Sequence, residues 1–97
     1  KSGAKGVVSV ASNLIPAPMV ELVNFCLNSQ WEKAEALHEK LFPLFKDLFI
    51  EPNPVPAKYA LAKTGMIATS AVRLPLCRMS DEHCLKLMQT LNSLNLI

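Results

Sequence analysis

The chain has 97 residues, a formal net charge of +2 and a hydrophobic fraction of 51%. At this size it can form one domain, and its apolar content is ample for a packed core and too high for a disordered chain. The lysines are scattered from Lys1 to Lys86, which argues against the clustered basic face of a nucleic-acid-binding protein. No apolar run approaches the roughly 20 residues that a membrane helix needs.

The three cysteines, Cys26, Cys77 and Cys84, have no paired spacing. An odd number without a Cys-x-x-Cys pattern favours reduced thiols in a cytosolic protein over a disulfide framework. The first residues do not resemble a signal peptide, because a short β-branched run follows them instead of a leucine-rich one. The chain begins without an initiator methionine, so we expect that Lys1 is not a natural start.

Residues 6–11 predict a β-strand. They form a short β-branched apolar run between Gly6 and Ser12, and apolar residues on both faces are typical of a strand covered on both sides in a parallel α/β sheet. No other segment predicts a strand convincingly. Because a single strand cannot satisfy its own backbone N–H and C=O groups, its partners are expected outside this sequence.

Two helices are predicted next. Pro16 and Pro18 suit a helix start, and residues 19–27 carry apolar side chains at helical spacing. Residues 30–49 predict a longer helix that contains Pro43 and has one apolar face. The residues of that face are Trp31, Ala34, Leu37, Leu41, Leu44 and Leu48.

Three prolines at alternate positions, Pro52, Pro54 and Pro56, predict a stiff extended connector after the longer helix. Each proline fixes its own φ and disfavours the α region for the residue before it. A short helix over residues 57–64 follows and ends at Gly65. Residues 72–76 are expected to be extended, since Leu74 precedes a proline.

Ser80 predicts the N-cap of a last helix, and Asp81 and Glu82 lie favourably against its dipole. The apolar face expected for this helix consists of Leu85, Leu87, Met88, Leu91 and Leu94.

The residues that could bind a metal ion or act as nucleophiles do not form a recognisable site. His83 and Cys84 are adjacent, so on a helix they point about 100° apart, and His38 has no second ligand at a useful spacing. Cys77 and Ser80 lie near His83 in the sequence, but no template of base and orienting group surrounds them, and Ser80 is better explained as a cap.

Acidic and amine groups provide no better candidate. Asp47 and Glu51 are close in sequence, yet nothing predicts the burial and convergence that paired catalytic carboxylates require. Lys46, Lys58 and Lys63 lie in amphipathic or loop segments, which predict solvated amines instead of the desolvated amine of a Schiff base. From the residues alone we expect no catalytic residue, no metal ligand and no cofactor.

Three blocks of the sequence, in this order, resemble the C-terminal third of the dihydrodipicolinate synthases. They are residues 3–13, residues 51–58 (EPNPVPAK) and residues 72–76 (VRLPL). The first block is shared more widely among pyruvate aldolases, including the sialic-acid lyases, and the second is the more specific marker. The intervening helices match in length and character, so the resemblance covers essentially the whole chain.

The resemblance implies a fold class that is mostly α-helical with one covered strand, namely the C-terminal part of a (β/α)8 TIM barrel followed by an appended helical domain. Residues 1–29 then correspond to the last β/α unit of the barrel, and residues 30–97 to the C-terminal helical domain. On this mapping the lone strand is the eighth barrel strand, and its neighbours are missing from the sequence.

The resemblance also implies a lyase of lysine (diaminopimelate) biosynthesis, in which pyruvate condenses with L-aspartate-β-semialdehyde through a Schiff base. The family's lysine and its catalytic tyrosine precede this segment, and Tyr59 does not match the tyrosine motif. Val8 matches the residue that binds pyruvate through its backbone carbonyl. The 97-residue chain by itself is therefore expected to be inactive.

Two alternatives remain open. The parent protein could belong to another branch of the pyruvate aldolases, such as a sialic-acid or keto-deoxy-sugar lyase, or the chain could be a helical interaction module without an enzymatic parent. The resemblance implies pyruvate and aspartate semialdehyde as partners of the parent enzyme, a homo-oligomer that is often a tetramer, and a cytoplasmic location. It implies neither nucleic acid nor a membrane as a partner.

Overall fold

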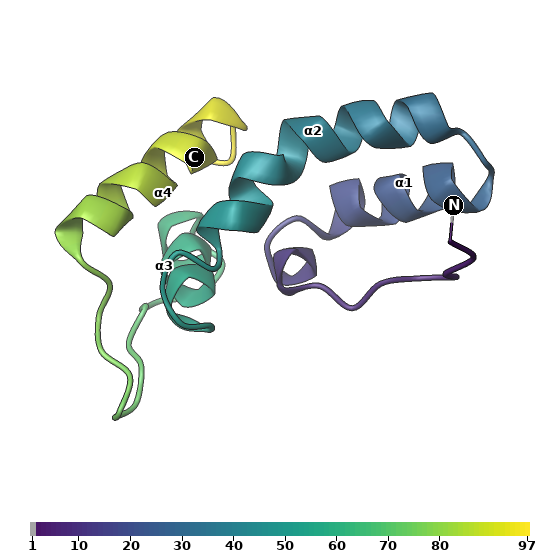
Figure 1. Ribbon diagram of the computed structural model, residues 1–97. Coiled ribbons are helices and arrows are strands. Elements are labelled where there is room, and N and C mark those ends of the chain that lie inside the picture. The colour runs from purple at the N-terminus through teal and green to yellow at the C-terminus, as the bar shows by residue number, and fades with distance from the viewer. Residues whose placement is uncertain (1) are drawn as a thin grey trace.

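The computed structural model describes residues 2–97, which form four α-helices and one short 3-10 helix (Figure 1). Helices α1 and α2 lie side by side, while α4 contacts both α2 and α3. The 3-10 helix, η1, contacts α1 and α3. The elements are η1 (Val10–Asn13), α1 (Pro16–Leu27), α2 (Trp31–Asp47), α3 (Val55–Lys63) and α4 (Asp81–Ser93).

The mostly helical fold class is confirmed, but residues 2–97 contain no strand, so the strand predicted over residues 6–11 is wrong for this structure. The backbone at Ser9 is extended, with φ −138° and ψ 136°. A β-strand also needs a neighbour for its ladder of hydrogen bonds, and the described residues provide none. At Val10 the chain turns into η1, where Ser9 Oγ accepts a hydrogen bond from the Ala11 N–H at 3.2 Å.

Three of the helices end in the same way. A residue in the left-handed region follows each of them: Ser29 (φ 56°) after α1, Gly65 (φ 79°) after α3 and Asn95 (φ 56°) after α4. The next N–H then donates back to a carbonyl five residues earlier, which is the Schellman arrangement. These hydrogen bonds join Gln30 to Phe25 (2.8 Å), Met66 to Leu61 (2.9 Å) and Leu96 to Leu91 (2.9 Å).

Helix α3 begins earlier than predicted. Pro54 is its N-cap, Val55 is its first residue and Pro56 lies in its first turn, so the extended connector does not continue through Pro56. The first turn of a helix leaves its N–H groups without intrahelical partners, and a proline there loses nothing. This tolerance outweighs the restriction that Pro56 places on Val55, which is the first residue of α3.

Residues 72–76 form a turn instead of an extended segment. The Leu76 N–H donates to the Arg73 carbonyl at 3.0 Å, and the Leu74–Pro75 bond at the centre of this turn is cis. This chain reversal divides the long connection between α3 and α4 into two arms.

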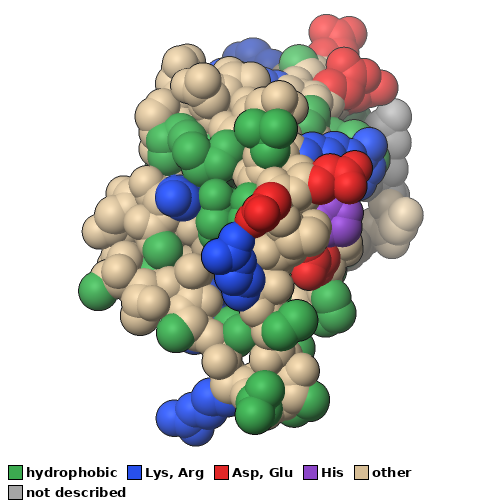
Figure 2. All heavy atoms as spheres, turned by 90° about the vertical axis from the view of Figure 1, so that its left-hand side faces the viewer, with side chains coloured by type: hydrophobic (Ala, Val, Ile, Leu, Met, Phe, Trp, Pro, Cys, Tyr) green, Lys and Arg blue, Asp and Glu red, His purple; other side chains and the backbone are tan. Residues whose placement is uncertain are grey.

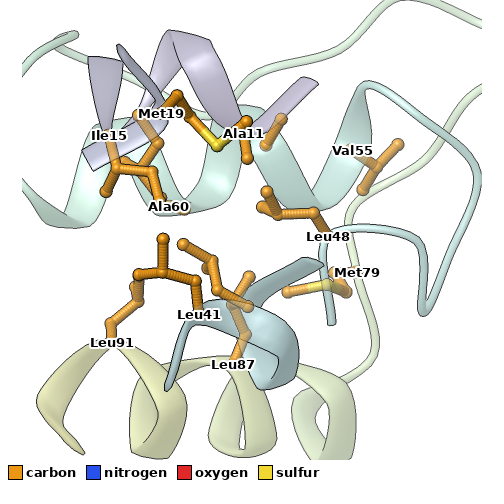
Figure 3. Packing of buried hydrophobic residues seen from close by; sticks show 13 residues of the cluster. Ala11, Ile15, Met19, Leu41, Leu48, Val55, Ala60, Met79, Leu87 and Leu91 are labelled. Atoms are coloured by element: carbon orange, nitrogen blue, oxygen red, sulfur yellow. The ribbon is translucent and has the colours of Figure 1, made fainter. Parts of the chain in front are cut away.

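The hydrophobic core draws side chains from η1 and all four helices (Figure 3). Leu44 of α2 and Leu87 and Leu91 of α4 are completely buried, as the two predicted apolar faces require. The assignment of Leu85 to the apolar face of α4 is wrong, because Leu85 is 63% exposed. Both predicted segments, residues 1–29 and residues 30–97, contribute to this one cluster.

None of the helices that residues 2–97 form is both long and apolar enough to span a membrane.

Candidate functional site

Val8, the one residue to which the resemblance assigns a role, lies in the segment that precedes η1. Val8 is fully exposed (104%), and its neighbour Val7 is also exposed. Two residues further along, Val10 packs against the core and Ala11 is buried in it. The segment is therefore anchored at its η1 end and leaves Val8 accessible.

A hollow of about 530 Å³ separates this segment from helices α1 and α2. Val7 and Ser9 are among its lining residues, whereas Val8 between them is not. Residues 3–6 line the hollow as well, so Val8 is the one residue between Gly3 and Ser9 that does not face it. The opposite wall of the hollow is mostly apolar and includes Met19, Leu22, Leu27, Trp31 and Phe45.

His38 also lines the hollow, and its imidazole packs on aromatic rings. The ring centroids of Phe42 and Phe45 both lie 5.7 Å from the centroid of the imidazole. These contacts explain His38 as part of an aromatic cluster on α2. They give it no partner for proton transfer.

Glu51 connects the segment after α2 to the start of α4. Its Oε2 accepts a hydrogen bond from the Ser80 N–H at 2.9 Å and lies 2.8 Å from His83 Nδ1. The backbone N–H of Ser80, followed by the His83 side chain, lowers the pKa of the Glu51 carboxyl. Ser80 caps α4 as predicted, because its Oγ accepts a hydrogen bond from the His83 N–H at 3.3 Å. Glu51 and His83 thus hold α4 in place.

Asp47 is only 2% exposed, a burial that the sequence does not lead us to expect. Its carboxylate accepts a hydrogen bond from the Thr90 hydroxyl, and its Oδ1 lies 3.8 Å from Lys86 Nζ. Both partners belong to α4. The signal for burial was present in the sequence, since Asp47 follows Leu44 by three positions on the apolar face of α2. Its role is to join α2 to α4.

The amines of the three lysines that could form a Schiff base either contact other groups of the chain or lie in solvent. Lys46 is exposed. Lys58 Nζ donates a hydrogen bond to the Ala71 carbonyl, and Lys63 Nζ lies 5.4 Å from the centroid of the Tyr59 ring. None of these three amines is enclosed in an apolar pocket, the setting in which a lysine becomes a nucleophile.

Tyr59 is half-buried on α3. Burial raises the pKa of its hydroxyl, and a hydrogen bond with the Cys84 side chain acts in the same direction. Cys84 Sγ also lies 3.7 Å from the Met79 carbonyl, which places the thiol among packing contacts.

The remaining thiols, Cys26 and Cys77, are free and exposed. Within residues 2–97 no group of three His, Cys, Asp or Glu side chains converges to hold a metal ion. Glu51, His83 and Ser80 lie together in one group, and Asp47, Thr90 and Lys86 in another. Both groups connect helices, and neither contains a nucleophile activated by a base.

Comparisons with known proteins identify the same family over nearly the whole chain. The dihydrodipicolinate synthetase family matches residues 1–94. A relative from Methanocaldococcus jannaschii named 4-hydroxy-tetrahydrodipicolinate synthase is 50% identical over 95 residues, which are 98% of this chain and 32% of the relative. A relative of the same name from Protochlamydia amoebophila is 48% identical over 92 residues, which are 95% of this chain and 30% of the relative.

Solved structures of dihydrodipicolinate synthases contain the same helical arrangement. One crystal structure, 50% identical, superposes with a TM-score of 0.94 and covers 98% of this chain and 33% of its own. The enzyme from Thermotoga maritima, 41% identical, gives a TM-score of 0.93 over 98% of this chain and 32% of its own. The chain thus spans about a third of the length of these relatives, and its fold is the corresponding part of theirs. Sequence and structure together show that the chain belongs to the dihydrodipicolinate synthetase family.

Proposed function

We propose that this chain is the C-terminal third of a lyase that condenses pyruvate with L-aspartate-β-semialdehyde in lysine and diaminopimelate biosynthesis. The name shared by the relatives, 4-hydroxy-tetrahydrodipicolinate synthase, supports this branch over the sialic-acid and keto-deoxy-sugar lyases. The superposition with solved synthases at 50% identity is the observation that carries the proposal.

In this proposal residues 1–29 are the last β/α unit of a barrel and residues 30–97 are the helical domain that follows it. The extended backbone at Ser9 supports the first assignment, since its φ and ψ are those of a β-strand. Val8 then provides its backbone carbonyl to pyruvate, and its exposure leaves this carbonyl accessible.

The Schiff-base lysine lies outside this chain in our proposal. The settings of Lys46, Lys58 and Lys63 support this, because a lysine that attacks a ketone needs a desolvated amine. The parent enzyme is expected to be a cytoplasmic homo-oligomer, often a tetramer, that binds pyruvate and aspartate semialdehyde.

Borohydride trapping tests where the nucleophile lies. A lysine amine adds to the pyruvate ketone and loses water, and borohydride then reduces the resulting C=N bond to a stable secondary amine. We expect no adduct on the isolated chain. In a chimera in which this chain replaces the matching third of the Methanocaldococcus jannaschii relative, peptide mass spectrometry should place the adduct in the relative's own part. An adduct on any lysine of this chain would overturn the proposal, and samples without pyruvate give the background.

A backbone change in the same chimera tests the role of Val8. Replacing the N–H of Ser9 by an ester oxygen weakens the Val8 carbonyl as an acceptor and leaves every side chain unchanged. Because one hydrogen bond is worth about 0.5–1.5 kcal/mol, the KM for pyruvate should rise about three- to tenfold. The Val8→Ala variant keeps the carbonyl and serves as the control, with a KM near that of the unmodified chimera. Equal KM values for the ester and the control would refute the assignment.

A further inference from the structure

The connection between α3 and α4, residues 64–80, projects away from the helices as two arms joined at a narrow end (Figure 1). The turn between Arg73 and Leu76 closes this end. Figure 2 shows basic and hydrophobic side chains gathered on this projection, at the lower edge of the molecule. We refer to residues 73–76 as the loop end.

Two charged residues of the EPNPVPAK segment hold the arms of this loop. Lys58 donates to the Ala71 carbonyl on the outgoing arm. Glu51 accepts from the Ser80 N–H at 2.9 Å on the returning arm. The two ties lie on either side of the loop end, so the base of the projection is fixed to α3 and to the end of α2.

The loop end itself exposes apolar surface. Leu74 is 90% exposed, and Arg73 and Pro75 are exposed beside it. Burying a leucine side chain stabilises a protein by about 1.5–3 kcal/mol. A loop that holds Leu74 in water does not gain this stabilisation. A flexible loop could fold such a residue back, whereas this loop is tied at both arms.

The surface area of the chain supports a partner of substantial size. Its accessible surface is 6520 Å², while a compact monomer of 10.7 kDa exposes about 5,500 Å². The excess, about 1,000 Å², is close to what one partner buries in a standard interface. The same backbone conformation occurs in a crystal structure of which this chain covers only 33%, at a TM-score of 0.94. The remaining two-thirds of that structure is available to cover the exposed residues.

We infer that the loop end docks onto the remaining two-thirds of a synthase of this family, with Leu74 in an apolar depression and Arg73 beside a carboxylate. The inference rests on the proposed function, because the partner is the barrel part of that enzyme. Lys58 and Glu51 of the EPNPVPAK segment then hold the two arms of the loop, so that the loop end has the position in which it docks.

Hydrogen–deuterium exchange of the isolated chain and of the chimera provides the first test. Amides of residues 72–77 should exchange at least about tenfold more slowly in the chimera, because docking removes them from solvent. Equal exchange in the two proteins would overturn the inference. If the chimera does not fold, a smaller graft of residues 64–80 alone into the same relative, compared with the isolated chain, carries the same readout.

A pair of variants provides the second test. Leu74→Ala should leave the melting temperature of the isolated chain unchanged and lower that of the chimera by about 4 °C or more. Leu85→Ala is the control. It truncates an exposed leucine of α4, outside the loop, and measures the change in melting temperature that such a truncation causes in each protein. Arg73→Gln should lower the melting temperature of the chimera as well, by less in high salt, since salt screens the ion pair. If Leu74→Ala affects both proteins alike, the loop end does not dock.

Catalysis separates the two proposals. A chimera without synthase activity whose loop end is protected from exchange contradicts the proposed function and supports the docking. An active chimera whose loop end exchanges freely contradicts the docking alone.

Discussion

At Glu51 a single carboxylate oxygen serves two donors that lie far away in the sequence, the Ser80 N–H and the His83 ring. The sequence predicted Ser80 as a cap but did not connect it with Glu51, because the two residues are 29 positions apart. Periodicity and capping rules describe neighbours along the chain. A tie between two elements depends on tertiary packing, which those rules do not contain.

The contribution of Glu51 to stability should depend on pH. Its folded pKa lies below the ordinary value of 4.5, so the contribution is present in full above that pH and is lost as the pH falls through the lower folded value. Urea unfolding of the wild type and of Glu51→Gln, repeated at falling pH, measures the difference between their free energies of unfolding. The difference should be largest near neutral pH and should shrink in acid.

The control for this experiment is Glu35→Gln, a change of the same kind at an exposed position of α2. Its effect on the free energy of unfolding should be small at every pH. A difference between the wild type and Glu51→Gln that stays constant down to strongly acidic pH would contradict the assignment.

At the scale of single elements, the sequence predicted helices well and the strand poorly. Helices α1, α2 and α4 follow from apolar spacing, from prolines at a helix start and from the cap at Ser80, all of which act within a few residues. A strand depends on hydrogen bonds to other strands, and residues 2–97 do not supply them. The candidate at Val8 came from a family resemblance, since neither composition nor spacing distinguishes Val8 from Val7.

Two leucines of α4 that the sequence assigned to one face have different surroundings. Leu87 is completely buried, whereas Leu85 is 63% exposed. The two positions are two residues apart, so on a helix their side chains point in very different directions, and only one of them can face α2 and α3.

Truncation of these leucines should therefore differ in cost. Leu87→Ala should lower the free energy of unfolding by about 2–5 kcal/mol, because it leaves a cavity in the core. Leu85→Ala should change it by no more than about 0.5 kcal/mol. Urea denaturation of the isolated chain at 25 °C measures both values, and similar costs for the two variants would contradict the packing of α4.

For the whole molecule, the dimensions indicate an open shape. The radius of gyration is 14.4 Å and the extents are 42 × 26 × 21 Å, whereas a compact domain of this length has a radius of gyration of about 12.5 Å. The same shape is present in synthases of which this chain is about a third. The sequence could predict a core but not this openness, which depends on how the helices are arranged.

The isolated chain should self-associate. Val7, Val8, Phe42 and Phe49 are all exposed, and exposed apolar side chains promote association. Sedimentation velocity over a wide range of concentrations should show an average mass that rises with concentration. Val8→Lys should weaken the association. Ser12→Lys adds the same charge at an exposed position nearby and should leave it unchanged. A monomer at all concentrations would contradict this expectation.

The Schellman ends of α1, α3 and α4 have a consequence for the order of folding. Each of these reversals is closed by a hydrogen bond between residues only five positions apart, so it can form within microseconds and without distant contacts. The ties from Lys58 to Ala71 and from Glu51 to Ser80 span 13 and 29 positions. The α1–α2 hairpin should consequently assemble first, and the ties that fix the α3–α4 connection should close last.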